Sequence, residues 1–278
     1  MPLPSKDQIK ELENLCTKIR VEIIQMLAKA GSGHTAGPLG SVEEMVGLYF
    51  GGSVKYDILN PISEGRDLVV VSCGHYAPAL YATLAFAGFF NVEKLQEFRS
   101  FRSPLQGHPH RGELPGVENT SGPLGEGLSQ AVGMALALKM NHKKNHVFCL
   151  MSDGEQDEGN TWEAVLLANK YHLDNLVAII DRNHIQITGD TEKILPLDDL
   201  EAKYKSFGWE VITIDGNDLK TVIHSLYKAK NYKIGPIVII ANTVSGKGVK
   251  FMENKAQWHG KAPTIKEAEK AIKLLTGI

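Results

Sequence analysis

Five short apolar runs, rich in β-branched residues, stand out along the chain. They cover residues 68–71, 147–151, 176–180, 211–214 and 237–241. Strands that are buried on both faces have such continuous apolar stretches, whereas strands with one solvated face alternate apolar and polar residues. The pattern therefore predicts buried, parallel strands.

Between these runs, apolar residues recur at helical spacing. The clearest stretch covers residues 6–30 and stops at Gly31, which predicts an amphipathic surface helix. A capping-box pattern, in which a small polar residue is followed three positions later by Glu or Gln, predicts where helices begin. It occurs four times, at Ser5 with Gln8, Ser41 with Glu44, Asn160 with Glu163, and Thr264 with Glu267.

The alternation of strands and helices predicts an α/β fold, with a doubly wound, mostly parallel sheet covered by helices on both faces. We expect residues 1–278 to form a single domain, because no linker or internal repeat interrupts the pattern. Ligands of such sheets bind at the carboxyl ends of the strands. Residues that directly follow the strands are therefore the candidates for function.

Two segments depart from the regular alternation. Residues 101–127 are rich in Gly, Pro and His and have no periodicity, which is typical of a functional loop. Residues 128–140 form a predicted helix with almost no polar face. We expect this helix to be buried, either in the centre of the domain or against a partner.

Composition narrows the class of protein. The 30 basic and 32 acidic residues are spread along the chain and give a net charge of -2, so nothing indicates nucleic-acid binding. No apolar run is long enough to cross a membrane, and the first residues lack a signal-peptide pattern, so we expect a cytoplasmic protein. The three cysteines are far apart in apolar segments and are interpreted as reduced core thiols.

The main candidate for chemistry lies after two of the predicted strands. Ser152, Asp153 and Gly154 follow the strand that ends at residue 151, and Asn183 follows the strand that ends at residue 180. Carboxylate, carboxamide and backbone oxygens are the ligands that Mg²⁺ prefers, and Gly154 would let the backbone approach a phosphate. Taken alone, Asp153-Gly154 could equally be an ordinary turn that ends a strand.

The pairing of these two segments resembles the diphosphate motif of thiamine-diphosphate enzymes, and further motifs extend the likeness to transketolases. They follow the family's order and spacing over nearly the whole chain. The motifs are Ser32-Gly33-His34, Gly37-Pro38-Leu39-Gly40, Gly74-His75, Gly107-His108-Pro109, Gly122-Pro123-Leu124-Gly125 and Trp258-His259-Gly260.

The resemblance implies a role for each matching position. Asp153, Asn183 and the backbone oxygen of Ile185 would bind Mg²⁺, for which Ca²⁺ can substitute. Contacts to the cofactor would come from His75, Gly122, Leu124, Gly154, Asn183 and His259. His34, His108 and His259 would line the catalytic channel, where imidazoles can donate to or accept from a sugar. Glu158 matches a family acid at the subunit interface.

Three positions depart from the family pattern. Ser152 stands where glycine is usual, Thr35 where proline is frequent, and His184 where glycine is common. Ser152 is small enough to keep the turn, so we expect cofactor binding to survive. Thr35 and His184 are expected to change the shape of the channel.

The resemblance also implies what must come from elsewhere. The family's proton-abstracting glutamate belongs to a pyrimidine-binding domain, which we expect on a partner chain, the C-terminal transketolase subunit, in an α2β2 heterotetramer. The implied activity is transfer of a two-carbon ketol unit between phosphate sugars in pentose phosphate metabolism. Two alternatives stay open. One is a related transferase such as deoxyxylulose-phosphate or dihydroxyacetone synthase, and the other is a non-catalytic regulatory protein that binds thiamine diphosphate.

Overall fold

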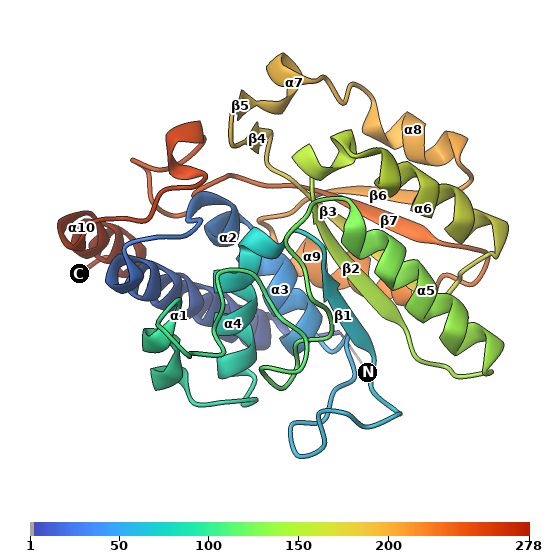
Figure 1. Ribbon diagram of the computed structural model, residues 1–278, viewed down its shortest axis with the longest axis horizontal. Coiled ribbons are helices and arrows are strands. Elements are labelled where there is room, and N and C mark those ends of the chain that lie inside the picture. The colour runs from blue at the N-terminus through green and yellow to red at the C-terminus, as the bar shows by residue number, and fades with distance from the viewer. Residues whose placement is uncertain (1–2) are drawn as a thin grey trace.

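A five-stranded parallel sheet forms the centre of the computed structural model, which describes residues 3–278 (Figure 1). The strand order is β1-β2-β3-β7-β6 and all four neighbouring pairs are parallel. The strands are β1 (Leu68–Val71), β2 (Val147–Ser152), β3 (Leu176–Arg182), β6 (Glu210–Asp215) and β7 (Ile237–Asn242). The five predicted strands and the doubly wound fold class are confirmed.

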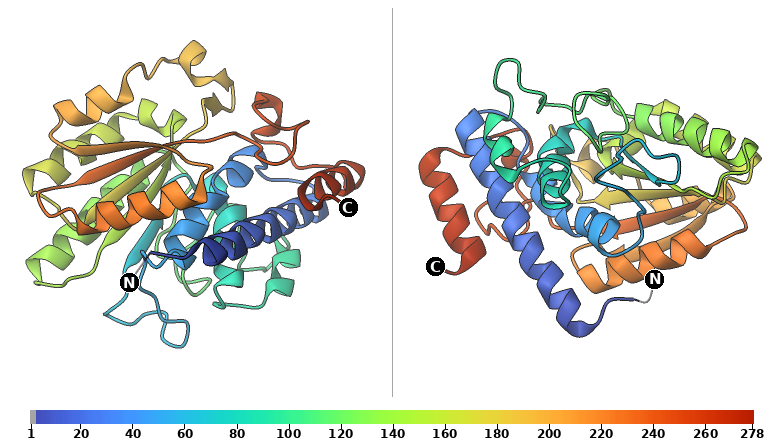
Figure 2. Two further views of the ribbon diagram at one scale, coloured as in Figure 1. Left: turned by 180° about the vertical axis from the view of Figure 1, so that it is seen from behind. Right: turned by 90° about the horizontal axis from the view of Figure 1, so that it is seen from below.

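Helices cover both faces of this sheet. Alternate residues of each strand point to opposite faces, so they contribute to two separate hydrophobic cores. The smaller core packs against α5 (Glu126–Met140), α6 (Gly159–Lys170) and α8 (Leu200–Ser206). The larger core packs against α1 (Lys6–Ala30), α2 (Ala36–Gly40), α3 (Val42–Phe50), α4 (Ala77–Phe86), α9 (Leu219–Asn231) and α10 (Ile265–Thr276). Figure 2 shows the two layers from behind and from below.

The remaining elements are short and lie in the connections. A hairpin of β4 (Ile185–Gln186) and β5 (Gly189–Asp190) follows β3 and leads into α7 (Thr191–Ile194). Short 3-10 helices cover Gly74–Tyr76, Val92–Glu97, Gly154–Asp157 and Ala256–Trp258. Residues 99–125 contain no helix or strand, as the sequence predicts for most of this loop.

Two of the four predicted capping boxes are confirmed. Ser5 with Gln8 caps α1, and Thr264 with Glu267 caps α10. The helix start predicted at Ser41 is also confirmed, because α3 begins at Val42, and the start predicted at Asn160 is close, because α6 begins at Gly159. The capping-box bonds of these two pairs, however, do not form. Ser41 stands at the N-cap of α3 but its side chain makes no cap bond, and Glu44 is buried at 1% exposure. Asn160 lies inside α6, which begins at Gly159, and its Nδ2 donates to the backbone oxygen of Gly125 at 2.9 Å.

The predicted surface helix α1 is solvated mainly in its first half, while its second half is buried beneath neighbouring helices. There Arg20 forms a buried ion pair with Glu43 of α3 at 2.5 Å, and its Nε donates to the backbone oxygen of Leu39 at 3.0 Å. Asn217 donates to the same Glu43 carboxylate at 3.1 Å. These bonds tie α1, α2 and α3 together, and with them the segment that carries His34.

The two predictions about burial have different outcomes. Cys16, Cys73 and Cys149 are free and buried, which confirms the interpretation as core thiols. Helix α5 packs one side on the sheet and exposes Gly133, Ala137 and Met140 on the other, so it is not buried in the centre of the domain. Among residues 3–278, no helix is long and apolar enough to cross a membrane.

Replacing Arg20 by Met should strongly destabilise the fold, because it leaves the Glu43 carboxylate buried without its cation. The expected loss is about 3–5 kcal/mol in the free energy of unfolding. Urea unfolding would measure it. Lys205→Met breaks an exposed ion pair with Glu201 and should cost less than about 1 kcal/mol. Equal losses in the two variants would contradict the assignment.

Candidate cofactor and active site

The parallel pairing of β2 with β3 brings two polar segments together at the carboxyl edge of the sheet. Ser152 stands opposite Asp181, and the amide of Asp153 donates to the Asp181 carbonyl at 3.1 Å. The Asp153 carboxylate accepts from the amide of Gly154 at 2.8 Å and from the amide of His184 at 2.6 Å. Arg182 Nη1 lies 3.2 Å from the same carboxylate. Asp153 is therefore fully buried and held in one orientation.

Asn183 is fixed just as firmly. Its Nδ2 donates to the Tyr76 hydroxyl at 2.9 Å and to the Asp181 carboxylate at 3.0 Å. Its Oδ1 accepts from the amide of Ile185 at 2.9 Å. Because both amide hydrogens are committed to buried acceptors, the side chain has one favourable orientation. The carboxamide oxygen is thereby set beside the backbone of Ile185.

The four histidines in the motifs come together from four distant segments. The imidazole centroids of His34 and His75 are 5.0 Å apart, those of His75 and His259 5.2 Å, and those of His34 and His259 5.5 Å. His108 lies 6.3 Å from His34 at the exposed side of the group. They line one cavity of about 390 Å³, which also has Gly122, Leu124, Gly154, Glu158 and Ile185 in its wall. Asp153 and Asn183 lie behind this wall and are bonded to the backbone of Gly154 and Ile185.

Burial keeps these imidazoles neutral near pH 7. Burial as the main cause, together with the neighbouring His259, His108 and Arg99, lowers the pKa of His34 to about 4. The pKa of His75 falls well below its usual value for the same reason, with burial as the main cause. Burial also lowers the pKa values of His108 and His259. Each ring can therefore donate from one nitrogen and accept at the other.

Burial acts in the opposite direction on the carboxyl group of Asp153. Its pKa is raised to about 7 by burial and then by the neighbouring Asp181, while Arg182 and two backbone amides oppose the shift. The ionised form is thus poorly stabilised by this chain alone. A cation next to Asp153 would stabilise that form.

Two loops approach each other so closely that glycine is required. A Cβ atom on Gly74 would lie 2.9 Å from the backbone nitrogen of Gly122, which leaves no space for a side chain. This contact fixes the loop with Gly122 and Leu124 against the segment that carries His75. Both walls of the cavity are thereby set by backbone packing.

The three departures from the family pattern have visible consequences. Thr35 Oγ1 donates to the Lys261 carbonyl at 2.6 Å and so fastens the first histidine segment to the last. His184 has a φ of 62°, a left-handed conformation that favours glycine, so the histidine there is strained. Ser152 is buried at the end of β2 and lines the cavity without blocking it.

Several residues near the cavity were not predicted from the sequence. Tyr76 lines it and also holds Asn183 and Asp181. Arg99 Nη1 donates a hydrogen bond to the Ser32 hydroxyl at 3.3 Å. The positive charge of Arg99 lies close enough to His34 and His108 to lower their pKa values. Tyr76 directly follows His75 and could have been suspected, whereas nothing local in the sequence singles out Arg99.

Two buried polar atoms in the cavity wall have no hydrogen-bond partner. They are His75 Nε2 and Gln186 Oε1, and both residues line the cavity. Unpaired buried polar groups are costly and are usually satisfied by water or a ligand. Across residues 3–278 there is no group of three or more His, Cys, Asp or Glu side chains that could hold a metal. The predicted metal ligands, with only one carboxylate, are not such a group.

Comparison with known proteins gives a consistent family. Residues 12–277 match the family model described as transketolase, thiamine diphosphate binding domain. The chain is 39% identical over 96% of its length to a subunit of the apulose-4-phosphate transketolase of Phocaeicola vulgatus, and it covers 94% of that subunit. It is 40% identical to the 6-deoxy-6-sulfo-D-fructose transketolase subunit SqwG of Clostridium sp. (strain MSTE9), with 92% of each chain covered.

Longer transketolases match over one part of their length. The chain is 35% identical to human transketolase over 97% of its own length but covers 42% of that protein. The transketolase structure from Campylobacter jejuni superimposes with a TM-score of 0.90 at 32% identity, covering 98% of this chain and 43% of the other. The chain thus spans about two fifths of these proteins. The fold, the motif geometry and these matches agree that the chain belongs to the transketolase family and contains its thiamine-diphosphate-binding domain.

Proposed function

We propose that this chain holds the diphosphate and metal of thiamine diphosphate in a two-subunit transketolase that transfers a two-carbon ketol unit between sugars. In this proposal residues 1–278 form one cofactor-binding domain. The observation that carries it is one cavity that is lined by four histidines and has Asp153 and Asn183 behind its wall, bonded to the backbone of Gly154 and Ile185. Oxygen ligands and proton-exchanging groups are thus within reach of one bound molecule.

The residues present fit a divalent metal and a diphosphate. The Asp153 carboxylate, the Asn183 carboxamide oxygen and the Ile185 carbonyl are hard oxygen donors of the kind that Mg²⁺ or Ca²⁺ binds. A metal would compensate the buried charge of Asp153. His75 Nε2 lacks a partner, and a diphosphate oxygen is the kind of acceptor that would satisfy it. Gly154, in the cavity wall, leaves room for a phosphate to approach the backbone.

When bound, thiamine diphosphate supplies the electron sink for carbon–carbon bond cleavage. The chain's own contribution is orientation and proton transfer. We assign His34, His108 and His259 to the sugar's carbonyl and hydroxyl groups, because neutral imidazoles can both donate and accept. Gly122 and Leu124 would contact the aminopyrimidine, since both line the cavity.

The proposed substrates are sugars with an anionic group. Arg99 lies on the exposed side of the cavity near His108 and would attract a phosphate. Two relatives of nearly the same length are named for a sugar phosphate and for a sulfosugar, which agrees with an anionic substrate. Phosphate sugars are our first choice.

The partner would be a second chain that carries the pyrimidine-binding half, and we propose an α2β2 assembly. Three relatives are named as single subunits of their transketolases. On this chain, the adjacent helices α5 and α6 carry an exposed apolar surface, with Met140 71%, Leu166 56% and Leu167 42% exposed. A permanent interface between subunits is apolar in this way and typically buries more than about 2,000 Å².

Replacing Asp153 by Asn keeps the shape of the side chain but removes its charge. Magnesium-dependent binding of thiamine diphosphate should weaken more than about tenfold, because the metal would lose its one carboxylate ligand. Calorimetry on the assembled protein would measure the affinity. Asp7→Asn, on the exposed start of α1, should bind like the wild type. Unchanged affinity in Asp153→Asn would refute the metal site.

The His34 imidazole should stay neutral at pH values well below the usual pKa of histidine. Its pKa in the folded chain is about 4, against about 6.5 when unfolded. The unfolded chain therefore binds more protons at this residue between these pH values, and His34 lowers stability there as the pH falls. NMR titration of the ring should give a midpoint near 4 in the folded chain, and a value near 6.5 would contradict the buried cluster.

Replacing Leu166 by Glu should abolish assembly with the second chain, since it puts a charge on the proposed interface. The isolated chain should keep its fold because Leu166 is 56% exposed. Sedimentation with the co-purified partner and a ketol-transfer assay would test this. Leu274→Glu places the same charge at an exposed leucine on α10 and should leave assembly intact. Full activity of the isolated wild-type chain would overturn the two-subunit proposal.

A further inference from the structure

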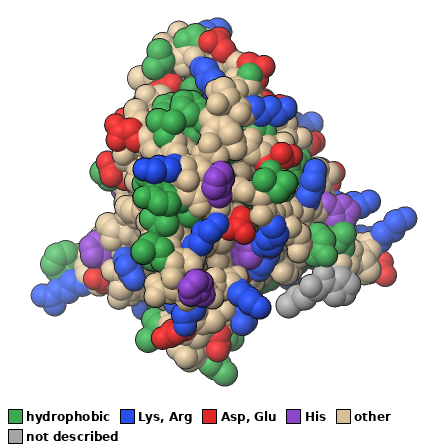
Figure 3. Space-filling view, turned by 90° about the vertical axis from the view of Figure 1, so that its right-hand side faces the viewer, with side chains coloured by type: hydrophobic (Ala, Val, Ile, Leu, Met, Phe, Trp, Pro, Cys, Tyr) green, Lys and Arg blue, Asp and Glu red, His purple; other side chains and the backbone are tan. Residues whose placement is uncertain are grey.

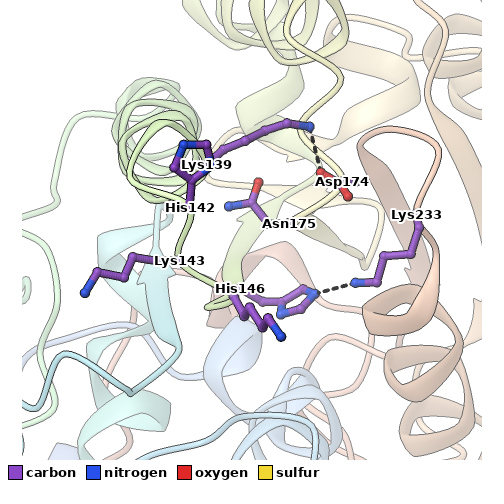
Figure 4. Close-up of a pocket in the computed structure, with 8 residues that line it drawn as sticks. Lys139, His142, Lys143, His146, Asp174, Asn175 and Lys233 are labelled. Carbon is purple, nitrogen blue, oxygen red and sulfur yellow. Dashed lines mark hydrogen bonds and ion pairs between the residues drawn. The ribbon is translucent and has the colours of Figure 1, made fainter.

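A second cavity lies at the opposite edge of the sheet from Asp153, next to the amino ends of β2 and β3. Its volume is about 570 Å³. Four lysines, two histidines, one aspartate and one asparagine line it, without any apolar side chain. Figure 4 shows these side chains at the connections between the strands, with Lys143 directed away from the rest, and Figure 3 shows Lys, Arg and His side chains interspersed with acidic and hydrophobic ones on the right-hand side of the molecule. We call it the amino-edge cavity.

Three connections build this cavity from distant parts of the chain. Residues 142–146 follow α5 and lead into β2, Asp174 and Asn175 precede β3, and Lys233 precedes β7. Since β2 has six residues at about 3.3 Å each, roughly 17 Å separates this edge from Ser152 at the other end of the strand. The amino-edge cavity is therefore distinct from the proposed active site.

The positive charge in the cavity is only partly compensated. Lys139 pairs with Asp174 at 2.7 Å and Lys143 with Glu64 at 2.9 Å. Lys144 and Lys233 have no carboxylate within ion-pair distance in the part of the chain that the structure describes. The whole chain has a net charge of -2, so this excess of cations is local.

Lys233 faces a neutral partner instead of a carboxylate. Its Nζ lies 3.0 Å from His146 Nε2, and it also donates to the Lys230 carbonyl at 2.9 Å. Burial, followed by the charge of Lys233, lowers the pKa of His146. Because an ammonium group can only donate, His146 must accept through Nε2. The ammonium charge thus remains available to an anion.

We propose that the amino-edge cavity binds a small phosphorylated polyol through its phosphate group. Lys144 and Lys233 supply uncompensated cations, and phosphate is the compact anion that lysine ammonium groups bind well. The volume falls within the range of small-molecule sites. The residues that line the cavity all end in polar or charged groups, which suit a molecule with hydroxyl groups. The same positive charge disfavours a metal ion.

Asn175 supports the hydroxylated part of the ligand. It is nine-tenths buried, its Nδ2 donates to the Ala135 carbonyl at 2.9 Å, and its Oδ1 has no hydrogen-bond partner. A sugar hydroxyl is a donor of the kind that this oxygen lacks. The Asn175 side-chain oxygen and the two lysines would then recognise different parts of one molecule.

The test uses the full chain without thiamine diphosphate and with EDTA, so that the metal site does not contribute. Calorimetric titrations with inorganic phosphate and with fructose 6-phosphate distinguish a free ion from a sugar phosphate. We expect fructose 6-phosphate to bind more tightly than phosphate. The Lys144→Ala and Lys233→Ala double variant should weaken binding at least about tenfold, because two charge-assisted contacts are lost.

Two further variants make the result decisive. Lys266→Ala with Lys273→Ala removes the same charge from exposed positions on α10 and should bind like the wild type. Arg99→Ala affects the proposed active site and should also leave this affinity unchanged. The proposal is overturned if the wild type binds neither phosphate nor fructose 6-phosphate at ligand concentrations up to about 10 mM. It is equally overturned if Arg99→Ala abolishes binding while the double lysine variant retains it.

Discussion

The register of β2 against β3 is the constraint on which the site depends. Ser152 stands opposite Asp181, so the residues that leave these two strands emerge side by side. This single pairing puts the Asp153 carboxylate against the amide of His184 and brings the Asn183 segment next to it. A shift of one residue would turn each side chain to the other face of the sheet. The two fully packed cores prevent such a shift, because each strand contributes apolar residues to both.

This arrangement concentrates unfavourable features at one edge. The pKa values of the Asp153 carboxyl and of the four imidazoles are shifted from their ordinary values. His184 has a left-handed backbone conformation. Beneath them, Glu44 is completely buried with no hydrogen-bond partner for either oxygen, and burial together with Asp181 raises its pKa well above the usual value. Such strain is typical of functional sites and is offset by packing elsewhere.

The sequence is most informative where structure is decided locally. The five strands are predictable because their apolar runs differ from every neighbouring segment, and Asp153 with Asn183 follow from their positions after two of them. Capping patterns succeed at Ser5 and Thr264, where the helix ends are solvated. The helix starts near Ser41 and Asn160 are also correct to within two residues, but their capping bonds do not form, because tertiary packing draws Glu44 into the core and Asn160 bonds to a different loop. Arg99 could not be predicted because its place depends on how the long loop crosses the cavity.

The most direct test of the account is a crystal structure of the chain, with its partner if required, grown with thiamine diphosphate and Mn²⁺ in place of Mg²⁺. The anomalous signal of manganese would locate the metal independently of the protein atoms. We predict one strong peak coordinated by Asp153, Asn183 and the carbonyl of Ile185, with the diphosphate against Gly154 and His75. A metal or diphosphate bound elsewhere, with the carboxyl edge filled only by water, would contradict the central claim.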